Sequence, residues 1–292
     1  MPELPEVETI KSGLDLFIVG HKFKEVKVLS EKTFPYAKEV TKTFVVGSRI
    51  KSVERRAKIL IINLDSEYSL LFHLKMTGQI IYDQKAGERF AGGHPTESMI
   101  HKLPDNSTRV IFIYDNGDKL YFNDQRKFGW IKLEPTSEVK NDSLIKRLGP
   151  EPLSEHFTLP GFKSVLKRRG RTPIKAVILD QSTVSGIGNI YADESLHLAK
   201  IHPATIAANL TDSEIKRLHR AIKEIIKRGI EYGGTSFTHY VNALGKTGDY
   251  LKHARVFRQT GRKCSVCGTE IVKTRVAGRG THLCPKCQKL KP

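Results

Sequence analysis

The first residues of the chain combine a proline with carboxylates in a way that could carry covalent chemistry. The sequence opens Met-Pro-Glu-Leu-Pro-Glu, so Pro2 follows Met1 directly and Glu3 and Glu6 lie beside it. If Met1 is removed, Pro2 becomes a secondary amine, and an α-amino group with a pKa near ~8 is partly neutral at pH 7. Such an amine attacks an electrophilic carbon and yields an iminium, while a neighbouring carboxyl group moves the proton. Proline also suits the first turn of a helix, so a catalytic and a structural interpretation both stay open here.

The cysteines form a second group with a defined chemistry. They follow the pattern C-x2-C-x16-C-x2-C near the C-terminus: Cys264, Cys267, Cys284 and Cys287. Tetrahedral zinc takes four thiolates, and two CxxC pairs joined by a hairpin supply them. A redox pair is the weaker alternative, since a reducing compartment does not favour disulfides. Because protein fills all four positions, the sequence predicts one structural Zn²⁺ ion and not a metal that activates water.

The charge balance points to a polyanionic partner. Lysine and arginine number 49 against 31 acidic residues, which gives a formal net charge of +18. Basic residues gather at 163–175 and again from Lys252 onward, where Glu270 is the only acid. Two basic segments favour a nucleic-acid channel over an ordinary solvated face. No apolar run is long enough for a membrane span and no secretory signal is visible, so we expect a cytoplasmic protein.

These groups need elements that position them. Apolar residues at helical spacing predict a helix over 5–18, and β-branched and aromatic stretches predict an antiparallel sheet or sandwich over the next hundred residues. Within the sandwich, 85–106 has the composition of a long loop. Helical periodicity returns after about residue 161, with Asn189 and Asp212 as expected N-caps. The chain is therefore predicted to be α+β and multidomain, with an N-terminal helix and sandwich, a helical domain and a zinc ribbon.

The predicted domain boundaries follow from these changes in pattern. The divisions are an N-terminal helix and sandwich at 1–134, a linker at 135–161, a helical domain at 162–236, a connector and loop at 237–254, and a zinc hairpin at 255–292.

Several motifs, in order and over nearly the whole length, resemble those of the formamidopyrimidine-DNA glycosylase family of base-excision repair enzymes. They are PELPEVE at 2–8, RRAK at 55–58, HLKMTG at 73–78, NDQRKFG at 123–129, IKAVILDQ at 174–181, SGIGNIYADE at 185–194, IHP at 201–203 and GRGTHLCPKCQ at 278–288. Most are weak alone, but together they are very specific.

The resemblance implies a role for each residue of the catalytic group. Pro2 nitrogen would attack the sugar C1′ of a damaged nucleotide, the base would leave, and elimination from the resulting Schiff base would cut the strand on both sides. Glu3 would be the general acid/base that helps ring opening, and Glu6 a supporting carboxylate. Lys58 would reach the lesion and an adjacent phosphate; taken alone, a lysine at the start of a strand is more often a solvated end. Arg279, between two glycines, would grip a phosphate.

The resemblance also implies how DNA is held. It makes 1–134 the catalytic domain, 162–236 a helix-two-turn-helix DNA-binding domain, and the loop within 237–254 the one that covers the lesion. An enzyme that works at C1′ must extrude the nucleotide and fill the hole, and Met76, Arg126 and Phe128 would supply that wedge. Lys175 and Asn189 would contact backbone phosphates. Ser236, Thr238 and Tyr240, in the loop at 233–250, are candidate contacts to the base.

The chain departs from the family pattern at four positions. Lys75 and Arg258 stand where glycine is common, Gln125 where proline is common, and Gln259 where arginine is common. The departures at Lys75 and Gln125 put the stiffness of their loops and the preference for the opposite base in doubt, and no site role is assigned at Arg258 and Gln259.

Three functions are weighed. The first is a bifunctional glycosylase/lyase that excises oxidised purines such as 8-oxoguanine and formamidopyrimidines from double-stranded DNA, and we expect it to act as a monomer. The second is the endonuclease VIII type, which prefers oxidised pyrimidines and tends to carry glycine at the position of Leu4. The third, a non-catalytic zinc-ribbon binder, does not explain why Pro2, Glu3, Lys58 and Arg279 occur together.

Overall fold

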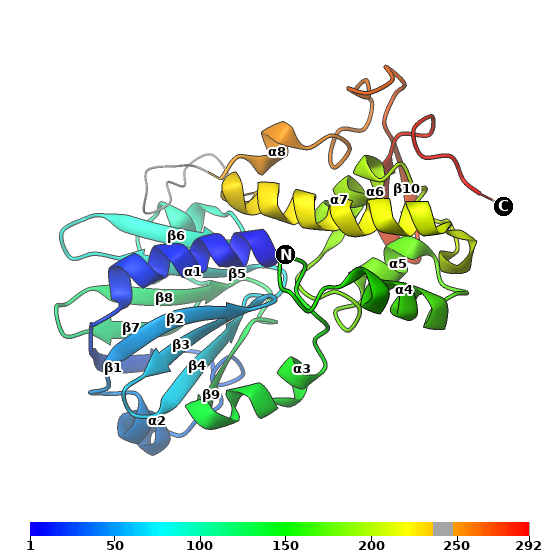
Figure 1. The fold of residues 1–292 in the computed structure, drawn as a ribbon. Coiled ribbons are helices and arrows are strands. Elements are labelled where there is room, and N and C mark those ends of the chain that lie inside the picture. The colour runs from blue at the N-terminus through cyan, green and yellow to red at the C-terminus, as the bar shows by residue number, and fades with distance from the viewer. Residues whose placement is uncertain (236–247, 292) are drawn as a thin grey trace. The chain divides into compact units, whose positions relative to one another are not determined.

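The computed structural model describes residues 1–235 and 248–291 (Figure 1). Its contacts divide the chain into two compact units. Unit 1 comprises Met1–Lys146 with Tyr232–Asp249, and unit 2 comprises Arg147–Glu231 with Tyr250–Pro292. The division at Lys146 falls inside the predicted linker 135–161, whose first residues form regular structure in unit 1. Ser236, Thr238 and Tyr240 lie outside the described residues.

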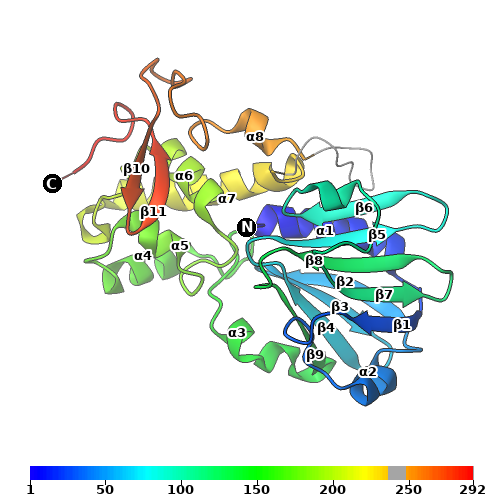
Figure 2. The same cartoon turned by 180° about the vertical axis from the view of Figure 1, so that it is seen from behind.

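Unit 1 contains two antiparallel sheets, as predicted (Figures 1 and 2). The five-stranded sheet has the order β1-β7-β8-β5-β6 and the four-stranded sheet the order β2-β3-β4-β9. The strands are β1 (Phe23–Val28), β2 (Ile50–Arg56), β3 (Ile59–Leu64), β4 (Tyr68–His73), β5 (Gly78–Asp83), β6 (Arg89–Gly93), β7 (Thr108–Tyr114), β8 (Lys119–Asp124) and β9 (Trp130–Pro135).

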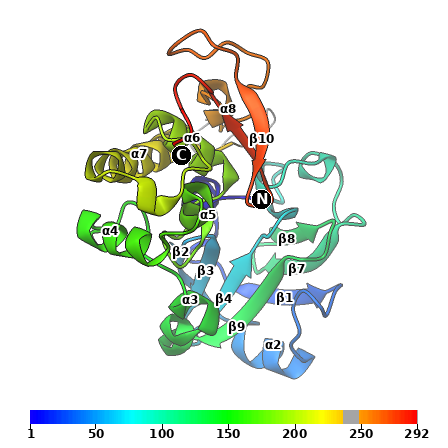
Figure 3. The same ribbon diagram turned by 90° about the vertical axis from the view of Figure 1, so that its right-hand side faces the viewer.

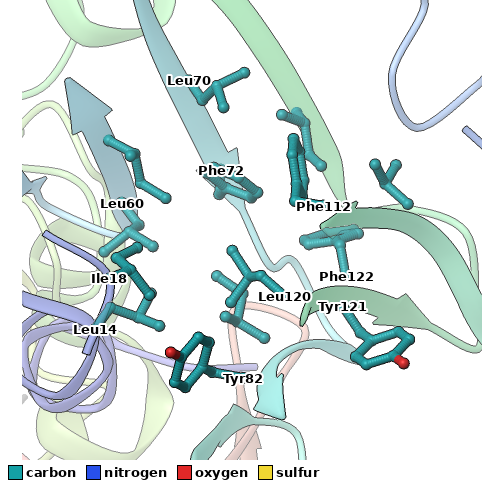
Figure 4. Close-up of a cluster of buried hydrophobic side chains, with 14 of the residues drawn as sticks. Leu14, Ile18, Leu60, Leu70, Phe72, Tyr82, Phe112, Leu120, Tyr121 and Phe122 are labelled. Carbon is teal, nitrogen blue, oxygen red and sulfur yellow. The ribbon is translucent and has the colours of Figure 1, made fainter. Parts of the chain in front are cut away.

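The inner faces of the two sheets share one hydrophobic core (Figure 4). Phe72 from the four-stranded sheet lies with its ring centroid 5.9 Å from that of Phe112 and 6.1 Å from that of Phe122, both from the five-stranded sheet. Leu60 and Leu70 extend the same contact. Full burial of each such side chain contributes about 1.5–3 kcal/mol, so this core fixes the loops at the ends of the strands.

Helix α1 (Leu4–Ile18) packs against β2 and β6, which are edge strands of different sheets. Its buried apolar residues follow helical spacing. The approach is close, because a Cβ on Gly92 would meet Ile10 at 2.3 Å and one on Gly13 would meet the Phe90 ring at 1.9 Å. The prediction of a loop over 85–106 was therefore wrong for β6, a short strand whose two glycines weaken the sequence signal.

Shorter helices complete unit 1. They are α2 (Lys38–Phe44), the 3-10 helices η1 (Glu97–Met99) and η2 (Thr136–Asn141), and α3 (Ser143–Lys146).

Unit 2 is helical and ends in a two-stranded hairpin, which lies alongside α6 (Figure 3). Its elements are α4 (Leu159–Arg168), α5 (Ile174–Leu179), α6 (Asn189–Leu198), η3 (Ala207–Asn209), α7 (Asp212–Glu231), α8 (Tyr250–His253), β10 (Val272–Val276) and β11 (Arg279–Leu283). In the described residues, no helix combines the length and apolar character that a membrane span requires.

Two predicted caps lie one residue away from where the sequence placed them. Gly188 is the N-cap of α6, so Asn189 is its first helical residue. Thr211 precedes α7 and forms a reciprocal pair with Glu214: the Thr211 backbone N–H donates to Glu214 Oε2 over 2.8 Å, and the Glu214 N–H lies 3.4 Å from Thr211 Oγ1. Threonine can cap a helix as well as aspartate, which is why the pattern did not separate the two.

Candidate active site and nucleic-acid interface

The N-terminal residues are buried at the start of α1. Met1 is 43% exposed, whereas Pro2, Glu3 and Glu6 are buried. Glu3 is the N-cap of the helix, and its backbone N–H donates to Glu6 Oε2 over 2.8 Å. The other oxygen, Glu6 Oε1, accepts the backbone N–H of Thr235 over 2.8 Å. A buried carboxylate requires such donors. Glu6 therefore fixes both the residues next to Pro2 and Thr235, the last described residue before position 236.

Lys58 lies in the two-residue turn that joins β2 and β3. Ala57, its partner in the turn, has a φ of +53°, and Lys58 is only 6% exposed. The turn lies beside α1, because Arg55 Nε donates to Glu8 Oε2 over 2.7 Å. Lys58 is therefore not a solvated strand end. It is a buried cation in the part of unit 1 that also holds the start of α1.

His73 belongs to the same region, although its motif alone gives no sign of a role there. The register of β3 and β4 pairs Ile59 with His73, next to Lys58. Burial, together with the charges of Lys75 and Lys58, lowers the pKa of His73 to about 3. Its Nδ1 accepts the Lys75 backbone N–H over 3.0 Å, so the ring is neutral and carries its hydrogen on Nε2. The pairing of β3 with β4 places His73 beside Lys58, and the motif HLKMTG alone carries no information about that pairing.

Met76, Arg126 and Phe128 lie in two loops that the structure joins. Met76 is in the β4–β5 connection and the other two are in the β8–β9 connection, and all three are exposed. The Arg126 guanidinium carbon lies 4.8 Å from the centroid of the Phe128 ring. The neighbouring residues Thr77 and Asp124 hydrogen-bond to each other through their side chains.

Asp124 is the residue that organises this pair of loops. It is buried at the end of β8, and its Oδ2 accepts the backbone N–H groups of Phe128 over 2.8 Å and Gly129 over 2.6 Å. Its Oδ1 also accepts the Arg126 N–H over 3.2 Å. A carboxylate that holds several backbone donors makes a rigid turn, so the exposed ring and guanidinium are presented from a fixed base.

Arg279 lies at the tip of the β10–β11 hairpin in unit 2. Ala277 and Gly278 form the two-residue turn with φ of +47° and +75°, which matches the twist of paired strands. The turn pairs Val276 with Arg279 and leaves the Arg279 side chain exposed. The guanidinium is therefore placed on a short, regular hairpin, where it can bind an anion.

Lys175 is placed differently from what a phosphate contact requires. Its side chain is 0% exposed, and its Nζ lies 2.6 Å from Asp193 Oδ1. The same ammonium donates to Gly280 O over 2.9 Å and to Thr281 Oγ1 over 2.8 Å. Asn189 joins it, since its Nδ2 donates to the same Gly280 carbonyl over 2.8 Å. Both residues thus hold the strand that follows Arg279.

The four cysteine sulfurs fit a zinc ion. Among the described residues they form one cluster in which all Sγ atoms lie within 4.8 Å of one another. The Sγ atoms of Cys264 and Cys287 are 3.9 Å apart, and those of Cys267 and Cys284 are 3.4 Å apart. Four Zn–S bonds of about 2.3 Å in a tetrahedron give S···S edges of about 3.8 Å. The donor set and its spacing therefore match a closed structural site.

Comparison with known proteins places all of these residues in one context. Family models match residues 1–131 as the formamidopyrimidine-DNA glycosylase N-terminal domain, 148–241 as its H2TH domain, and 261–290 as the zinc finger found in FPG and IleRS. The formamidopyrimidine-DNA glycosylase of Pelotomaculum thermopropionicum is 42% identical over 293 residues, covering 100% of both chains. The chain belongs to the formamidopyrimidine-DNA glycosylase family.

Solved structures of this family agree over the same length. The Lactococcus lactis enzyme in complex with a Fapy-dG containing DNA is 36% identical, covers 98% of this chain and 100% of its own, and has a TM-score of 0.85. The same enzyme with an abasic site containing DNA gives a TM-score of 0.85 at 36% identity, covering 98% of this chain and 99% of its own. The fold class and the zinc ribbon predicted from the sequence are confirmed.

Two departures from the family pattern share a backbone cause. Lys75 and Arg258, at two positions where the resemblance implies glycine, have φ of +50° and +59°. In this left-handed region glycine is free of strain, whereas other residues cost about 1–2 kcal/mol. Both loops therefore have a backbone conformation that suits glycine, and the cations Lys75 and Arg258 are strained in it.

Proposed function

We propose that Pro2 nitrogen, freed by removal of Met1, is the nucleophile of a bifunctional DNA glycosylase and lyase. Membership of the formamidopyrimidine-DNA glycosylase family makes the chain a DNA glycosylase. The observation that carries the assignment of the nucleophile is the burial of Pro2 directly before the capping box of Glu3 and Glu6, at the start of a helix that lies beside the turn of Lys58.

The proposed reaction uses the residues in sequence. The lone pair of the Pro2 nitrogen forms a bond to the sugar C1′, while the bond from C1′ to the base breaks and its electron pair leaves on the base. The nitrogen passes its proton to Glu3, which protonates the ring oxygen so that the sugar opens to an iminium. Loss of the proton at C2′ then eliminates the 3′ phosphate, loss of the proton at C4′ eliminates the 5′ phosphate, and water hydrolyses the iminium to free the Pro2 amine. Lys58 supplies a cation that stabilises the charge that develops as the base departs.

The binding residues act on both strands of a duplex. The Lactococcus lactis relatives were solved with DNA that contains Fapy-dG or an abasic site, and DNA is the partner of this family. Met76, Arg126 and Phe128 fill the space that the extruded nucleotide leaves. Arg279 binds a phosphate, and the net charge of +18 favours the duplex.

Lys175 and Asn189 act in this proposal by positioning the hairpin. Both donate to the Gly280 carbonyl, and the Lys175 ammonium is fully buried against Asp193. Their hydrogen bonds hold the residue next to Arg279, so that the guanidinium keeps one pose. In this proposal Lys175 therefore acts on phosphate binding indirectly, through the pose of Arg279.

The preferred substrates are oxidised purines, including 8-oxoguanine and formamidopyrimidines. Leu4 is buried at the start of α1 and occupies the position where the endonuclease VIII type tends to carry glycine. Excision of oxidised pyrimidines is the alternative within the same chemistry. Competition between duplexes that carry 8-oxoguanine and an oxidised pyrimidine would separate the two.

Borohydride trapping tests the nucleophile. Protein whose intact mass shows that Met1 is absent should form a covalent adduct with a duplex containing 8-oxoguanine, and Pro2→Gly should abolish or greatly weaken it while DNA binding persists. Pro5→Gly is the matched control, because Pro5 lies in the first turn of α1 and carries no free amine. Unchanged trapping by Pro2→Gly, or full activity of protein that retains Met1, would remove Pro2 from the mechanism and leave a nucleic-acid binder.

We further propose that the protein acts as a monomer in the cytoplasm. A single catalytic set per chain and a duplex partner need no second copy. Sedimentation of the free protein and of its complex with a short duplex would test the stoichiometry, and a complex with two chains would contradict it.

A further inference from the structure

Helix α6 faces the zinc ribbon with polar side chains along one side. Asp193 accepts the His282 backbone N–H over 2.9 Å. Glu194, one residue further on, accepts the backbone N–H groups of residues 255–257 over 2.8–2.9 Å. His197 lies about one turn beyond Asp193, so it falls on the same side of the helix. These contacts belong to unit 2 and have a common direction, from α6 toward the ribbon.

His197 reaches the zinc site itself. Its Nε2 lies 3.5 Å from Cys264 Sγ, and the side chain is only 2% exposed. The second ring nitrogen, Nδ1, has no hydrogen-bond partner among the described residues. Within that part of the chain, the Cys264 sulfur is therefore the polar neighbour toward which the ring is directed.

We propose that His197 Nε2–H donates a hydrogen bond to the zinc-bound thiolate of Cys264. A thiolate is an anionic acceptor, and hydrogen bonds to ionised groups are stronger than neutral ones. A nitrogen lone pair in the same place would be repelled by the sulfur, so the hydrogen is on Nε2 and Nδ1 keeps its lone pair. His197 is a positioning residue for the zinc site and not a fifth ligand, because the four sulfurs already form the cluster that a tetrahedral ion needs.

The bond has a consequence for zinc affinity that is independent of the proposed nucleophile. Groups that hydrogen-bond to metal ligands typically change metal affinity by about 10–100-fold when removed. Cys264 belongs to the first CxxC pair, which is also held by its own loop, because the Cys264 N–H donates to Thr269 O over 2.8 Å. His197 thus attaches this pair to α6, the helix that also carries Asn189.

Zinc affinity of the full-length chain tests the proposal. His197→Phe keeps a ring and removes the donor, and we expect its zinc dissociation constant, measured by competition with a chromogenic chelator, to rise about tenfold or more. His197→Gln retains an N–H and should lose less. His219→Phe is the control, since His219 contacts the Phe157 carbonyl and ring and should leave zinc affinity unchanged. A His197→Phe affinity within about twofold of wild type would overturn the proposal.

Measurements on the unaltered protein keep the test decisive if His197→Phe does not fold. Nitrogen-15 NMR of the zinc-loaded chain should show His197 with hydrogen on Nε2, and substitution with cadmium-113 should reveal scalar coupling between that proton and the metal through the sulfur. Hydrogen on Nδ1 alone would refute the bond. Cobalt-substituted protein should give the absorption of a four-thiolate site, and a three-thiolate, one-nitrogen spectrum would make His197 a ligand and likewise overturn the proposal.

Discussion

The buried ion pair between Lys175 and Asp193 makes the sharpest prediction about the architecture of unit 2. Lys175→Met removes a cation whose Nζ lies within 3.0 Å of Asp193 Oδ1, Gly280 O and Thr281 Oγ1. Removal of one partner of a buried pair costs about 3–5 kcal/mol, because the other charge stays buried. Asp193 retains the His282 N–H at 2.9 Å, so we expect a loss near the lower end, about 3 kcal/mol.

Chemical denaturation followed by far-ultraviolet circular dichroism measures this loss, since the helices of unit 2 dominate the signal. Lys163→Met is the matched control. Lys163 pairs with Asp212 over 2.8 Å, but the two side chains are 36% and 82% exposed, and exposed pairs contribute about 0–1 kcal/mol. If Lys175→Met lowered the free energy of unfolding by no more than Lys163→Met does, the energy inferred for the buried pair would be refuted.

DNA binding then separates the indirect role of Lys175 from a direct phosphate contact. If Lys175 acts by holding the Arg279 hairpin, Lys175→Met should weaken binding strongly in the wild-type background and little in an Arg279→Ala background. Non-additivity of this kind is expected for residues that act as a unit. Additive losses in the double variant would instead mean that Lys175 contributes on its own, and the positioning argument would be wrong.

Four further outcomes follow from the same reasoning. Lys75→Gly and Arg258→Gly should each raise stability by about 0.5–1 kcal/mol in thermal unfolding, because they relieve left-handed strain at some cost in chain entropy; a decrease would contradict the strain. Asp124→Ala should free the backbone N–H groups of its loop and weaken binding to lesion duplexes, as measured by fluorescence anisotropy. The control Glu67→Ala, at an exposed acid, should change the affinity little. The pKa of His73 is lowered to about 3 from 6.5, so the unfolded state binds more protons and stability should fall as pH drops from about 6.5 to 3, a loss that His73→Gln should reduce. Removal of zinc with a chelator should weaken duplex binding far more than it slows trapping within complexes already formed, and equal effects on both would give zinc a part in the chemistry.

The sequence predicted the elements with strong local patterns and missed contacts that only tertiary packing creates. Helix α1 was expected over 5–18 and spans Leu4–Ile18, because its apolar spacing and first-turn proline are local. β6 was missed, since its role depends on Gly92 meeting α1, and no pattern within 85–106 records that approach. The cysteine spacing predicted the zinc site directly, as spacing and donor type are both visible in the chain.

The residues of the candidate site likewise fall into those that local sequence patterns indicate and those that only tertiary contacts reveal. Residues that act through their own chemical type, such as Pro2, Glu3 and Arg279, could be named from the motifs, although their roles stay predictions. Residues that act by holding others could not. Asp124 resembles any acid before a turn until its four partners are seen, and Lys175 resembles any basic residue until its burial is known. Hydrogen-bond partners far apart in sequence are set by the fold, and a single sequence does not contain them.

Lys75 is a strained cation in a loop whose backbone conformation suits glycine. Lys75 lies between His73 and Met76, in the loop joined to Asp124 through Thr77, and it contributes to the low pKa of His73. A glycine there would relieve strain of about 1 kcal/mol but would remove one positive charge next to the residues proposed to enter DNA. Each phosphate that a cation neutralises releases condensed counterions and favours binding at low salt. Retention of lysine at a position that suits glycine is therefore consistent with affinity for a polyanion outweighing local stability.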